Sequence, residues 1–398
     1  MTGLWFTLAR RLEPWRIWAT DARRWSSTTW PTGAGYSRIC TGAWLQEGTE
    51  TCPVGPVVSN ITPVHSIEGQ PIPVFVSTLL GVRAVPEFVR KPLEGLFPLI
   101  PLSLHEDQEI DFEGVRRSIE LVAASGAPGC IVFGSMGQMT SVTEKEFDAV
   151  CEMAVATGHA GGIAVVVGST ASYQREAIRR ARVAERAGAD GSMLAAPYAL
   201  PVTAEWALRF FTEVAGSLDG EMALMLYNYS PLTGMNLTAQ MWETLLDIPN
   251  IKAIKESNTF LPHFDEILIT IADRINVFAG NDPAFFHAST LGAAGATGIF
   301  SWAALRAGTR FVDECRRGNH DDPWVRSAFA ALQHFSAAIR RPDMPSMLSY
   351  EHGYLNAIAG LGGARTGVPR KPYGPLPDAA MVELKSAAAA LQDLEADL

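Results

Sequence analysis

The sequence predicts an α/β fold, a (β/α)8 barrel followed by a C-terminal helical extension. From residue 96 onward, short apolar runs alternate with segments of 3.6-residue periodicity, separated by Gly, Ser, Pro and Asn. The runs are continuously apolar, which is typical of parallel strands that are buried on both faces. Eight strand–helix units over about 220 residues fit a closed barrel better than an open doubly wound sheet.

The elements follow one another in a regular order. The eight predicted strands are Phe97–Leu104, Cys130–Phe133, Ile163–Val167, Ser192–Ala196, Ala223–Leu226, Ile251–Ile254, Ile275–Ala279 and Thr297–Phe300. The helices predicted between them are Phe112–Ala124, Glu144–Thr157, Tyr173–Ala187, Ala204–Ala215, Ala239–Leu246 and Asp282–Leu291. Thr143, followed by Glu144 and Glu146, predicts an N-cap with acidic residues in the first helical turn. Gly188, directly after Ala187, predicts a helix stop.

Three segments are predicted along the chain: an extension over residues 1–92, the barrel over 93–318 and a helical extension over 319–398. The last segment contains predicted helices at Asp322–Arg340, Met344–Ala359 and Asp378–Leu394. The first segment holds six of the ten tryptophans within its first 44 residues, and we expect it to be poorly ordered. A transit peptide is an alternative suggested by its Arg and Ser content, although Glu13 and Asp21 weaken it, and a secretory h-region is missing.

Composition excludes several classes of function. Of the 398 residues 47% are hydrophobic and 19% are charged, which is ordinary for a globular protein. A net charge of −10 without a basic stripe argues against nucleic acid or an anionic membrane as partner. Five scattered cysteines without a CxxC motif predict neither a disulfide framework nor a zinc site, and favour a reducing, cytoplasmic location. No apolar run of about 18 residues predicts a membrane span.

The residues that leave the predicted strands suggest chemistry, because active sites of such barrels form at the carboxyl ends of the strands. Lys255 follows the apolar run Ile251–Ile254, where its stem can be buried and its amine can face a cavity. Desolvation lowers the pKa of a lysine placed in this way and makes it a nucleophile for a carbonyl carbon. Tyr227 leaves the fifth strand and Ser135 the second. We therefore predict Lys255, Tyr227 and Ser135 as catalytic residues at one rim.

Further residues are predicted to bind the substrate. Gly134 and Gly137 bracket a tight turn whose backbone amides can hold a carboxylate. The side chains and turns at the same rim complete the predicted binding set, which consists of Gly134, Met136, Gly137, Tyr198, Leu232, Gly280, Phe300 and Ser301. Asn281 or Asp282 is expected to cap the next helix rather than to do chemistry. No Asp/His set with metal-ligand spacing is present, and no metal or organic cofactor is predicted.

Four ordered motifs and a closing segment resemble the dihydrodipicolinate synthase/N-acetylneuraminate lyase family over about residues 95–380. They are GSMGQMTSVTEKEF (134–147), YNYSPLTGMNL (227–237), IKAIKES (251–257), AGNDPAFF (279–286) and GARTGVPRKPYGPLP (363–377). The resemblance implies that Lys255 forms a Schiff base and that Tyr227 relays protons. It also implies that the turn at residues 134–137 holds the carboxylate of a 2-oxo acid, and that the protein is a homo-oligomer, a tetramer or a dimer.

The sequence departs from the family pattern at informative positions. Met136 stands where a threonine is usual, and Gln138 stands where a glutamate is usual. Ala199 stands where synthases have a tyrosine that reaches across an interface. Leu232 replaces the arginine that grips the second substrate's carboxylate in synthases, and leucine cannot make that bidentate contact. These departures disfavour 4-hydroxy-tetrahydrodipicolinate synthesis.

The predicted function is that of a class I lyase or aldolase that makes or breaks a carbon–carbon bond of a 2-oxo acid. Its partners would be a small 2-oxo acid such as pyruvate and an aldehyde. One alternative is a hydratase or dehydratase that uses the same imine on a sugar-acid-like substrate. Another is a catalytically silent barrel with a binding role, because a fold alone does not give function.

Overall fold

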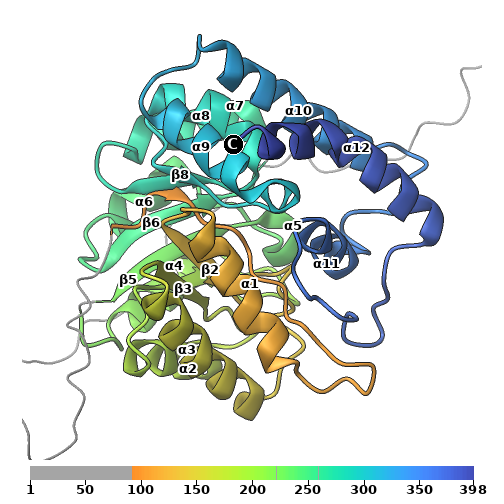
Figure 1. Cartoon of the computed structure of the whole chain (residues 1–398). Helices are drawn as coiled ribbons and strands as arrows, with labels where there is room; N and C mark the ends of the chain where they lie inside the picture. The colour runs from red at the N-terminus through yellow and green to blue at the C-terminus, as the bar shows by residue number, and fades with distance from the viewer. Residues whose placement is uncertain (1–91, 221, 259) are drawn as a thin grey trace, which may run out of the picture. The chain divides into compact units, whose positions relative to one another are not determined.

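The computed structural model describes residues 92–220, 222–258 and 260–398, and in this part of the chain it confirms the predicted barrel. Eight parallel strands form one sheet in the order β1-β8-β7-β6-β5-β4-β3-β2. A parallel bridge between Leu99 and Ile131 joins the chain after β1 to β2, so that the sheet nearly closes on itself (Figure 1). The strands are β1 (Gly95–Leu96), β2 (Gly129–Val132), β3 (Ala164–Gly168), β4 (Gly191–Ala195), β5 (Ala223–Asn228), β6 (Ile251–Glu256), β7 (Asn276–Ala279) and β8 (Gly295–Ala296).

Helices cover the outside of the strands, as Figure 1 shows. Two of them have the predicted bounds, α1 (Phe112–Ala124) and α4 (Ala204–Ala215). The others of the barrel are α2 (Glu144–Ala160), α3 (Gln174–Arg186), α5 (Ser230–Thr233), α6 (Ala239–Leu245), α7 (Leu261–Ile271), α8 (Phe285–Ala288) and α9 (Leu305–Arg316). Three of these helices, α5, α7 and α9, were not predicted from the sequence. The segment predicted as one helix, 282–291, consists of η1 (Asp282–Ala284), α8 and η2 (Ser289–Leu291).

The first and the eighth predicted strands were placed wrongly. The first predicted strand, 97–104, lies entirely after β1, because Pro98 and Pro101 have no N–H to donate to a strand ladder. The eighth, 297–300, begins after β8 has ended. Phe300 instead opens the 3-10 helix η3 (Phe300–Ala303), and its amide donates to the Asp282 carboxylate over 2.9 Å.

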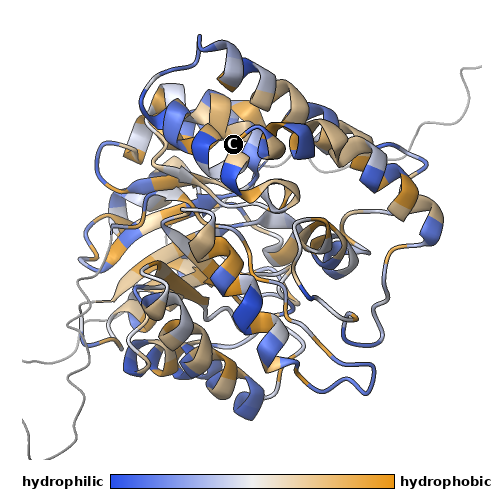
Figure 2. Ribbon diagram, in the orientation of Figure 1, coloured by the Kyte–Doolittle hydropathy of each residue, from blue (hydrophilic) through white to orange (hydrophobic). Residues whose placement is uncertain are grey.

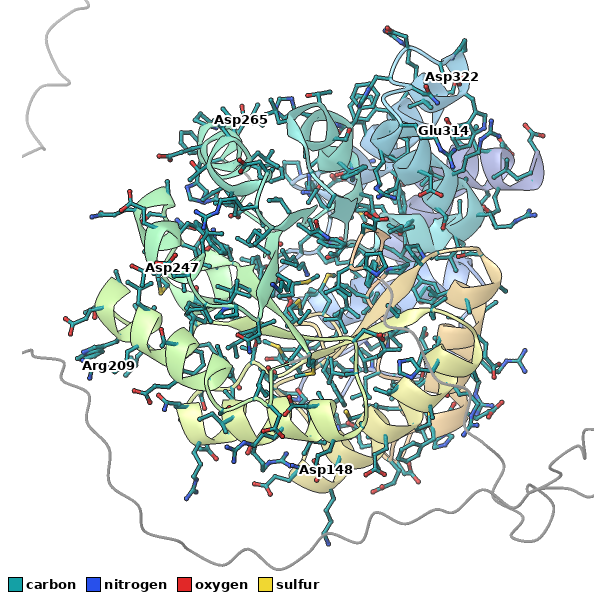
Figure 3. The ribbon with its side chains drawn as sticks, turned by 90° about the vertical axis from the view of Figure 1, so that its left-hand side faces the viewer. Asp148, Arg209, Asp247, Asp265, Glu314 and Asp322 are labelled. Carbon is teal, nitrogen blue, oxygen red and sulfur yellow. The ribbon has the colours of Figure 1, made fainter. Side chains whose placement is uncertain are left out.

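The core lies in the strands and on the inner faces of the helices. In Figure 2 the strands are largely hydrophobic, while the helices carry hydrophilic residues on part of their surface. The charged residues labelled in Figure 3 all lie at the periphery, on the outer helices or beside them. Local signals agree with the predictions: Thr143 and Glu146 form a capping box at the start of α2, and Gly188 has a positive φ of 83° after α3.

Three helices follow the barrel, as predicted: α10 (Pro323–Ile339), α11 (Glu351–Leu361) and α12 (Asp378–Ala396). α10 packs along α12, and α11 packs against η3 (Figure 1). α11 begins later than the predicted Met344, because Pro345 and a turn over residues 347–350 precede it. The side chain of His352 in its first turn lies 3.2 Å, Nδ1 to O, from the carbonyl of Met136. The extension therefore contacts the turn that follows β2.

The extension predicted over residues 1–92 lies outside the described residues, apart from its last residue. Within the described part, no helix combines the length and the apolar character that a membrane crossing requires.

We predict that Gly168→Ala destabilises the barrel. A Cβ at this position, at the end of β3, would lie 1.9 Å from the backbone carbonyl oxygen of Phe133. Overpacking of this kind costs about 1–3 kcal/mol, so the free energy of unfolding in urea should fall by about that amount. Gly360→Ala on α11 is the control, because nothing lies within 4 Å of its added Cβ and alanine favours a helix. Equal stability of the two variants would contradict the prediction.

Candidate active site

The register between β5 and β6 places Tyr227 beside Lys255. Successive side chains of a strand point to opposite faces, so Tyr227 and Lys255 face the barrel interior while Asn228 and Glu256 face outward. The Lys255 residue is 2% exposed, and its Nζ lies 4.2 Å from the centroid of the Tyr227 ring. The lysine and the tyrosine that the sequence singles out thus meet in space.

Burial sets the protonation of Lys255. Loss of hydration disfavours its ammonium form and lowers the pKa of Lys255 to about 7, while the carboxylates of Glu351 and Asp282 act in the opposite direction. Among the described residues, no carboxylate oxygen lies within ion-pair distance of its amine. A substantial fraction of the amine is therefore uncharged near neutral pH, as a nucleophile must be.

Ser135 reaches the same place from the turn after β2. Its Oγ lies 3.4 Å from the phenol oxygen of Tyr227, and either atom can be the donor. The ring of Tyr229 stacks on that of Tyr227, with centroids 5.5 Å apart and an angle of 6° between the rings. Burial raises the pKa of Tyr227 well above its usual range, although the bond to Ser135 lowers it. Tyr227 is therefore a neutral phenol, able to donate and to accept a proton in a relay.

The turn around Ser135 can hold an anion. Among the described residues, no acceptor is found for the backbone amides of Ser135, Met136 and Gly137, whereas those of Gln138 and Met139 donate to carbonyls within the turn. Unpaired amides on a tight turn attract a carboxylate. Gly137 suits this tight turn, because an added Cβ would lie only 3.0 Å from the carbonyl oxygen of Ile100.

Gln138, which replaces the usual glutamate of the turn, has a structural position. It is fully buried, its Nε2 donates to the carbonyl of Leu102 over 3.0 Å, and its Oε1 accepts from the amide of Arg370 over 2.7 Å. An amide supplies both the donor and the acceptor that these backbone groups require, which an ionised carboxylate cannot do. Gln138 thus joins the turn to the C-terminal extension.

A buried network on the outer face supports β5 and β6. The Glu256 carboxylate accepts from Asn228 Nδ2 over 2.8 Å and from the amide of Asn258 over 2.6 Å, and it lies 3.6 Å from His263. The amide of Gly280 donates to the carbonyl of Glu256 over 2.7 Å. A side chain at position 280 would clash with Ser257, which explains the glycine. The network holds the strand ends that carry Tyr227 and Lys255.

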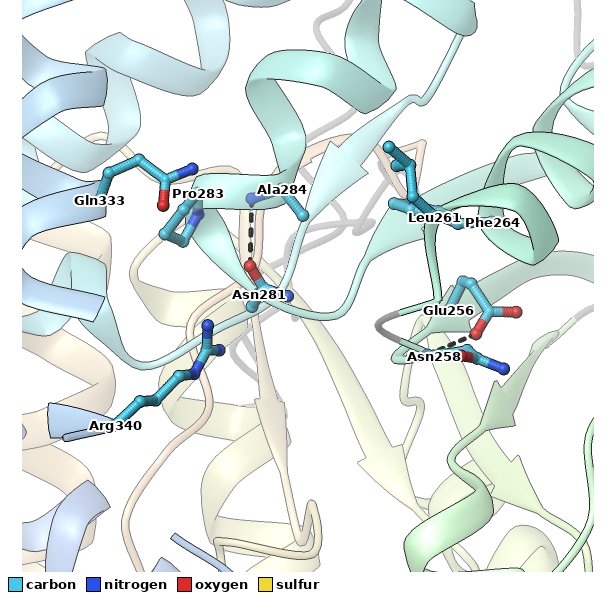
Figure 4. Close-up of a pocket in the computed structure, with 9 residues that line it drawn as sticks. All are labelled: Glu256, Asn258, Leu261, Phe264, Asn281, Pro283, Ala284, Gln333 and Arg340. Atoms are coloured by element: carbon cyan, nitrogen blue, oxygen red, sulfur yellow. Dashed lines mark hydrogen bonds between the residues drawn. The ribbon is translucent and has the colours of Figure 1, made fainter. Parts of the chain in front are cut away.

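A cavity of about 190 Å³ lies on this outer side. Figure 4 shows its lining, with Glu256 and Asn258 on one side, Asn281 and Arg340 on the other, and Asn281 Oδ1 bonded to the amide of Ala284. Asn281 therefore caps the next element, as predicted. Lys255 does not line this cavity. The cavity is therefore separate from the place where Lys255 and Tyr227 meet.

The other predicted binding side chains come from the segments that follow β4, β5 and β8. Tyr198 and Leu232 are half-buried, and Leu232 packs against the hydrophobic core. Phe300 turns toward the C-terminal extension, where its ring packs edge-on against Phe335 at 5.7 Å. Ser301 is buried beside it in η3. The predicted pocket wall is therefore partly a contact between the barrel and α10.

The structure adds one residue that the sequence analysis missed, Glu351. It is the first residue of α11, and its side chain is 23% exposed. Burial raises the pKa of Glu351 to about 7, and Lys255 lowers it. A glutamate in the first turn of a helix ordinarily indicates a favourable interaction with the helix dipole, so the sequence carried no signal of a role at the barrel mouth.

Comparisons with known proteins agree with this fold. Residues 92–391 match the model of the dihydrodipicolinate synthetase family. The chain is 31% identical over 213 residues to an uncharacterized DapA-like lyase of Rhizobium meliloti, covering 54% of this chain and 69% of that protein. It is 27% identical over 314 residues to a 4-hydroxy-tetrahydrodipicolinate synthase of Methanothrix thermoacetophila, covering 76% and 99%. The chain therefore belongs to the dihydrodipicolinate synthetase family.

Solved structures share the fold. YagE from E. coli K12, a prophage protein of the dihydrodipicolinic acid synthase family in complex with pyruvate, superposes with a TM-score of 0.67 at 23% identity, over 75% of this chain and 99% of YagE. A catalytic lysine mutant of the Ruminococcus gnavus sialic acid aldolase gives 0.68 at 19% identity, over 76% of this chain and 97% of the aldolase. At these identities the likeness concerns the fold.

We predict that Lys255 reacts as an amine with a midpoint near pH 7, because burial lowers its pKa. Below that pH the ammonium form predominates, and the rate of reductive methylation by formaldehyde should rise through pH 7 and then level off. Mass spectrometry of the Lys255 peptide gives the rate, with the exposed Lys252 of the same strand as reference for the reagent. A midpoint near 10, as for an ordinary lysine, would refute the prediction.

Proposed function

We propose that the protein is a lysine-dependent lyase of the class I aldolase type, which makes or breaks a carbon–carbon bond of a 2-oxo acid. The observation that carries this proposal is the desolvated Lys255 amine beside the Tyr227 ring. Membership of the dihydrodipicolinate synthetase family supports it, as does the shared fold of YagE, which was solved with pyruvate, and of an aldolase with a catalytic lysine.

In the proposed reaction, the neutral amine of Lys255 attacks C2 of the 2-oxo acid and water leaves, which gives an iminium ion. The unpaired amides of the turn at residues 134–137 hold the substrate's carboxylate. Tyr227, bonded to Ser135, passes the protons of carbinolamine formation and loss. The iminium nitrogen then accepts the electron pair of the breaking C3–C4 bond, which is the advantage of covalent catalysis by lysine.

Synthesis of 4-hydroxy-tetrahydrodipicolinate is a weaker candidate, although curated relatives carry that activity. Leu232, half-buried in α5, offers no charge to a second carboxylate, and Ala199 brings no phenol. We therefore expect pyruvate to be consumed with neutral aldehydes and not with aspartate semialdehyde. A rate with aspartate semialdehyde above that with acetaldehyde, glyceraldehyde and benzaldehyde would favour the synthase. Water loss without carbon–carbon cleavage would favour a dehydratase.

Location and assembly complete the proposal. We propose a cytoplasmic homo-oligomer, a tetramer or a dimer, with a barrel over residues 93–318 and an extension over 319–398. The three described cysteines are free and buried, in keeping with a reducing compartment. Leu200 and Trp206, at the rim after β4 and on α4, are 78% and 60% exposed, and large apolar groups of this kind gather in interfaces. Light scattering after gel filtration tests the oligomeric state.

We predict that Lys255→Ala abolishes covalent trapping. Borohydride should reduce the pyruvate imine of the wild-type protein to a stable adduct on the peptide that contains Lys255, whereas the variant has no amine at that place. Intact mass and peptide mapping measure the adduct. Labelling of the variant at the same site would show the assignment to be wrong, and failure of the wild type with several 2-oxo acids would favour a silent barrel.

We predict that Tyr227→Phe retains slow imine formation but loses turnover. The variant keeps the ring beside Lys255 and removes only the hydroxyl that Ser135 contacts. General acid–base catalysis contributes about 100- to 10,000-fold, so pyruvate consumption should fall by at least about 100-fold. Adduct yield after long incubation should stay near that of the wild type. Unchanged turnover would remove Tyr227 from the relay.

A further inference from the structure

Glu351 belongs to the C-terminal extension, but it lies at the site that the barrel builds. Its neighbour His352 is 3.2 Å from the carbonyl of Met136, which fixes the first turn of α11 beside Ser135. Glu351 is close enough for its charge to act on Lys255, Tyr227 and Tyr229. The start of α11 thus brings a carboxyl group to the mouth where the lysine and the tyrosine meet.

Within the part of the chain that the structure describes, the carboxyl group of Glu351 has no structural partner that would explain its position. Among the described residues, no hydrogen-bond donor binds it, and the closest cationic group is the ring of His352, 4.0 Å from Oε1. Burial lowers the pKa of His352, so this ring is mostly neutral at neutral pH. A largely buried carboxyl group without a donor costs stability, and such costs are concentrated at functional sites.

We propose that Glu351 is the catalytic acid and base for the hydroxyl group of the substrate's aldehyde half. This inference rests on the proposed lyase function and assigns a residue to the step after imine formation. The turn at residues 134–137 and Tyr227 serve the carboxylate half of the substrate, and Leu232 cannot exchange a proton. Glu351 therefore supplies the acid and base that the hydroxyl group of the aldehyde half requires.

In cleavage, the Glu351 carboxylate takes the proton of the C4 hydroxyl, the C3–C4 bond breaks, C4 becomes the aldehyde carbon, and the electron pair passes to the iminium nitrogen to give an enamine. In the reverse direction, the addition reaction, the enamine carbon C3 attacks the aldehyde carbon, and the Glu351 carboxyl group gives its proton to the aldehyde oxygen. A carboxyl whose pKa lies near neutrality can do both.

The charges around Glu351 come from several elements. Lys255 faces it from β6, Tyr227 and Tyr229 from β5 and the residue after it, and His352 from its own helix. Asp282 of η1 also acts on Lys255. Once Lys255 has become an iminium ion, its fixed positive charge favours the carboxylate form, so cleavage should lose rate as the pH falls through and below 7.

The test separates imine chemistry from carbon–carbon chemistry in Glu351→Gln. Three rates are measured: borohydride trapping with pyruvate, exchange of the C3 protons of pyruvate in D2O, and addition of pyruvate to acetaldehyde, glyceraldehyde and benzaldehyde. We expect addition to fall by at least about 100-fold while trapping and exchange persist. Trapping at pH 7 should be unchanged or faster, because the Glu351 charge raises the pKa of Lys255 and its removal lowers that pKa.

Two further variants serve as controls. Glu351→Asp keeps the acid on a shorter side chain and should restore part of the addition rate together with its pH dependence. Glu383→Gln makes the same chemical change on the surface of α12, where the side chain is 49% exposed and pairs with Arg341, and it should leave all three rates unchanged.

Each other outcome has a defined meaning. Equal loss of trapping, exchange and addition in Glu351→Gln would give Glu351 a structural role and overturn the inference. Wild-type addition rates in that variant would overturn it too, with the lyase function intact. A wild-type protein that traps no 2-oxo acid, or that adds none of the three aldehydes, would overturn the proposed function and the inference together.

Discussion

The desolvation of the Lys255 amine is the constraint on which the rest of this site depends. Lys255 can act as a nucleophile near neutral pH only because the barrel surrounds it with protein, so that its ammonium form loses its hydration. A nearly closed ring of parallel strands provides such a place, since its interior is filled by side chains and its loops gather at one end. In the proposed mechanism the fold thus makes the amine reactive through exclusion of water.

The same burial acts on the acid that faces the amine. It lowers the pKa of Lys255 and raises the pKa of Glu351, and both come to about 7. The charge of each group acts on the other, so that their exchange of protons is linked. Formation of an imine removes the lysine from this exchange and leaves its positive charge in place. The acid then becomes the group in the site whose protonation can change most easily.

The sequence predicted the parts of this protein that depend on local pattern. Continuous apolar runs located the strands, and the lysine and the tyrosine at their ends were found because both belong to regular elements in register. The first strand was misplaced because Pro98 and Pro101 interrupt its backbone hydrogen bonds within an apolar segment. The eighth was misplaced because the amide of Phe300 donates to the Asp282 carboxylate instead of to a neighbouring strand. Glu351 could not be predicted, since its place at the mouth results from tertiary packing of α11.

The domain boundary drawn between barrel and extension therefore does not coincide with the boundary of the site. Gln138 binds the amide of Arg370 and His352 approaches the carbonyl of Met136, so the turn that would hold the substrate is fastened to the extension on both sides. A neutral glutamine suits this attachment, because a buried carboxylate there could not donate to Leu102. The departure from the family's usual glutamate thus fits a turn whose buried amide side chain must both donate to Leu102 and accept from Arg370.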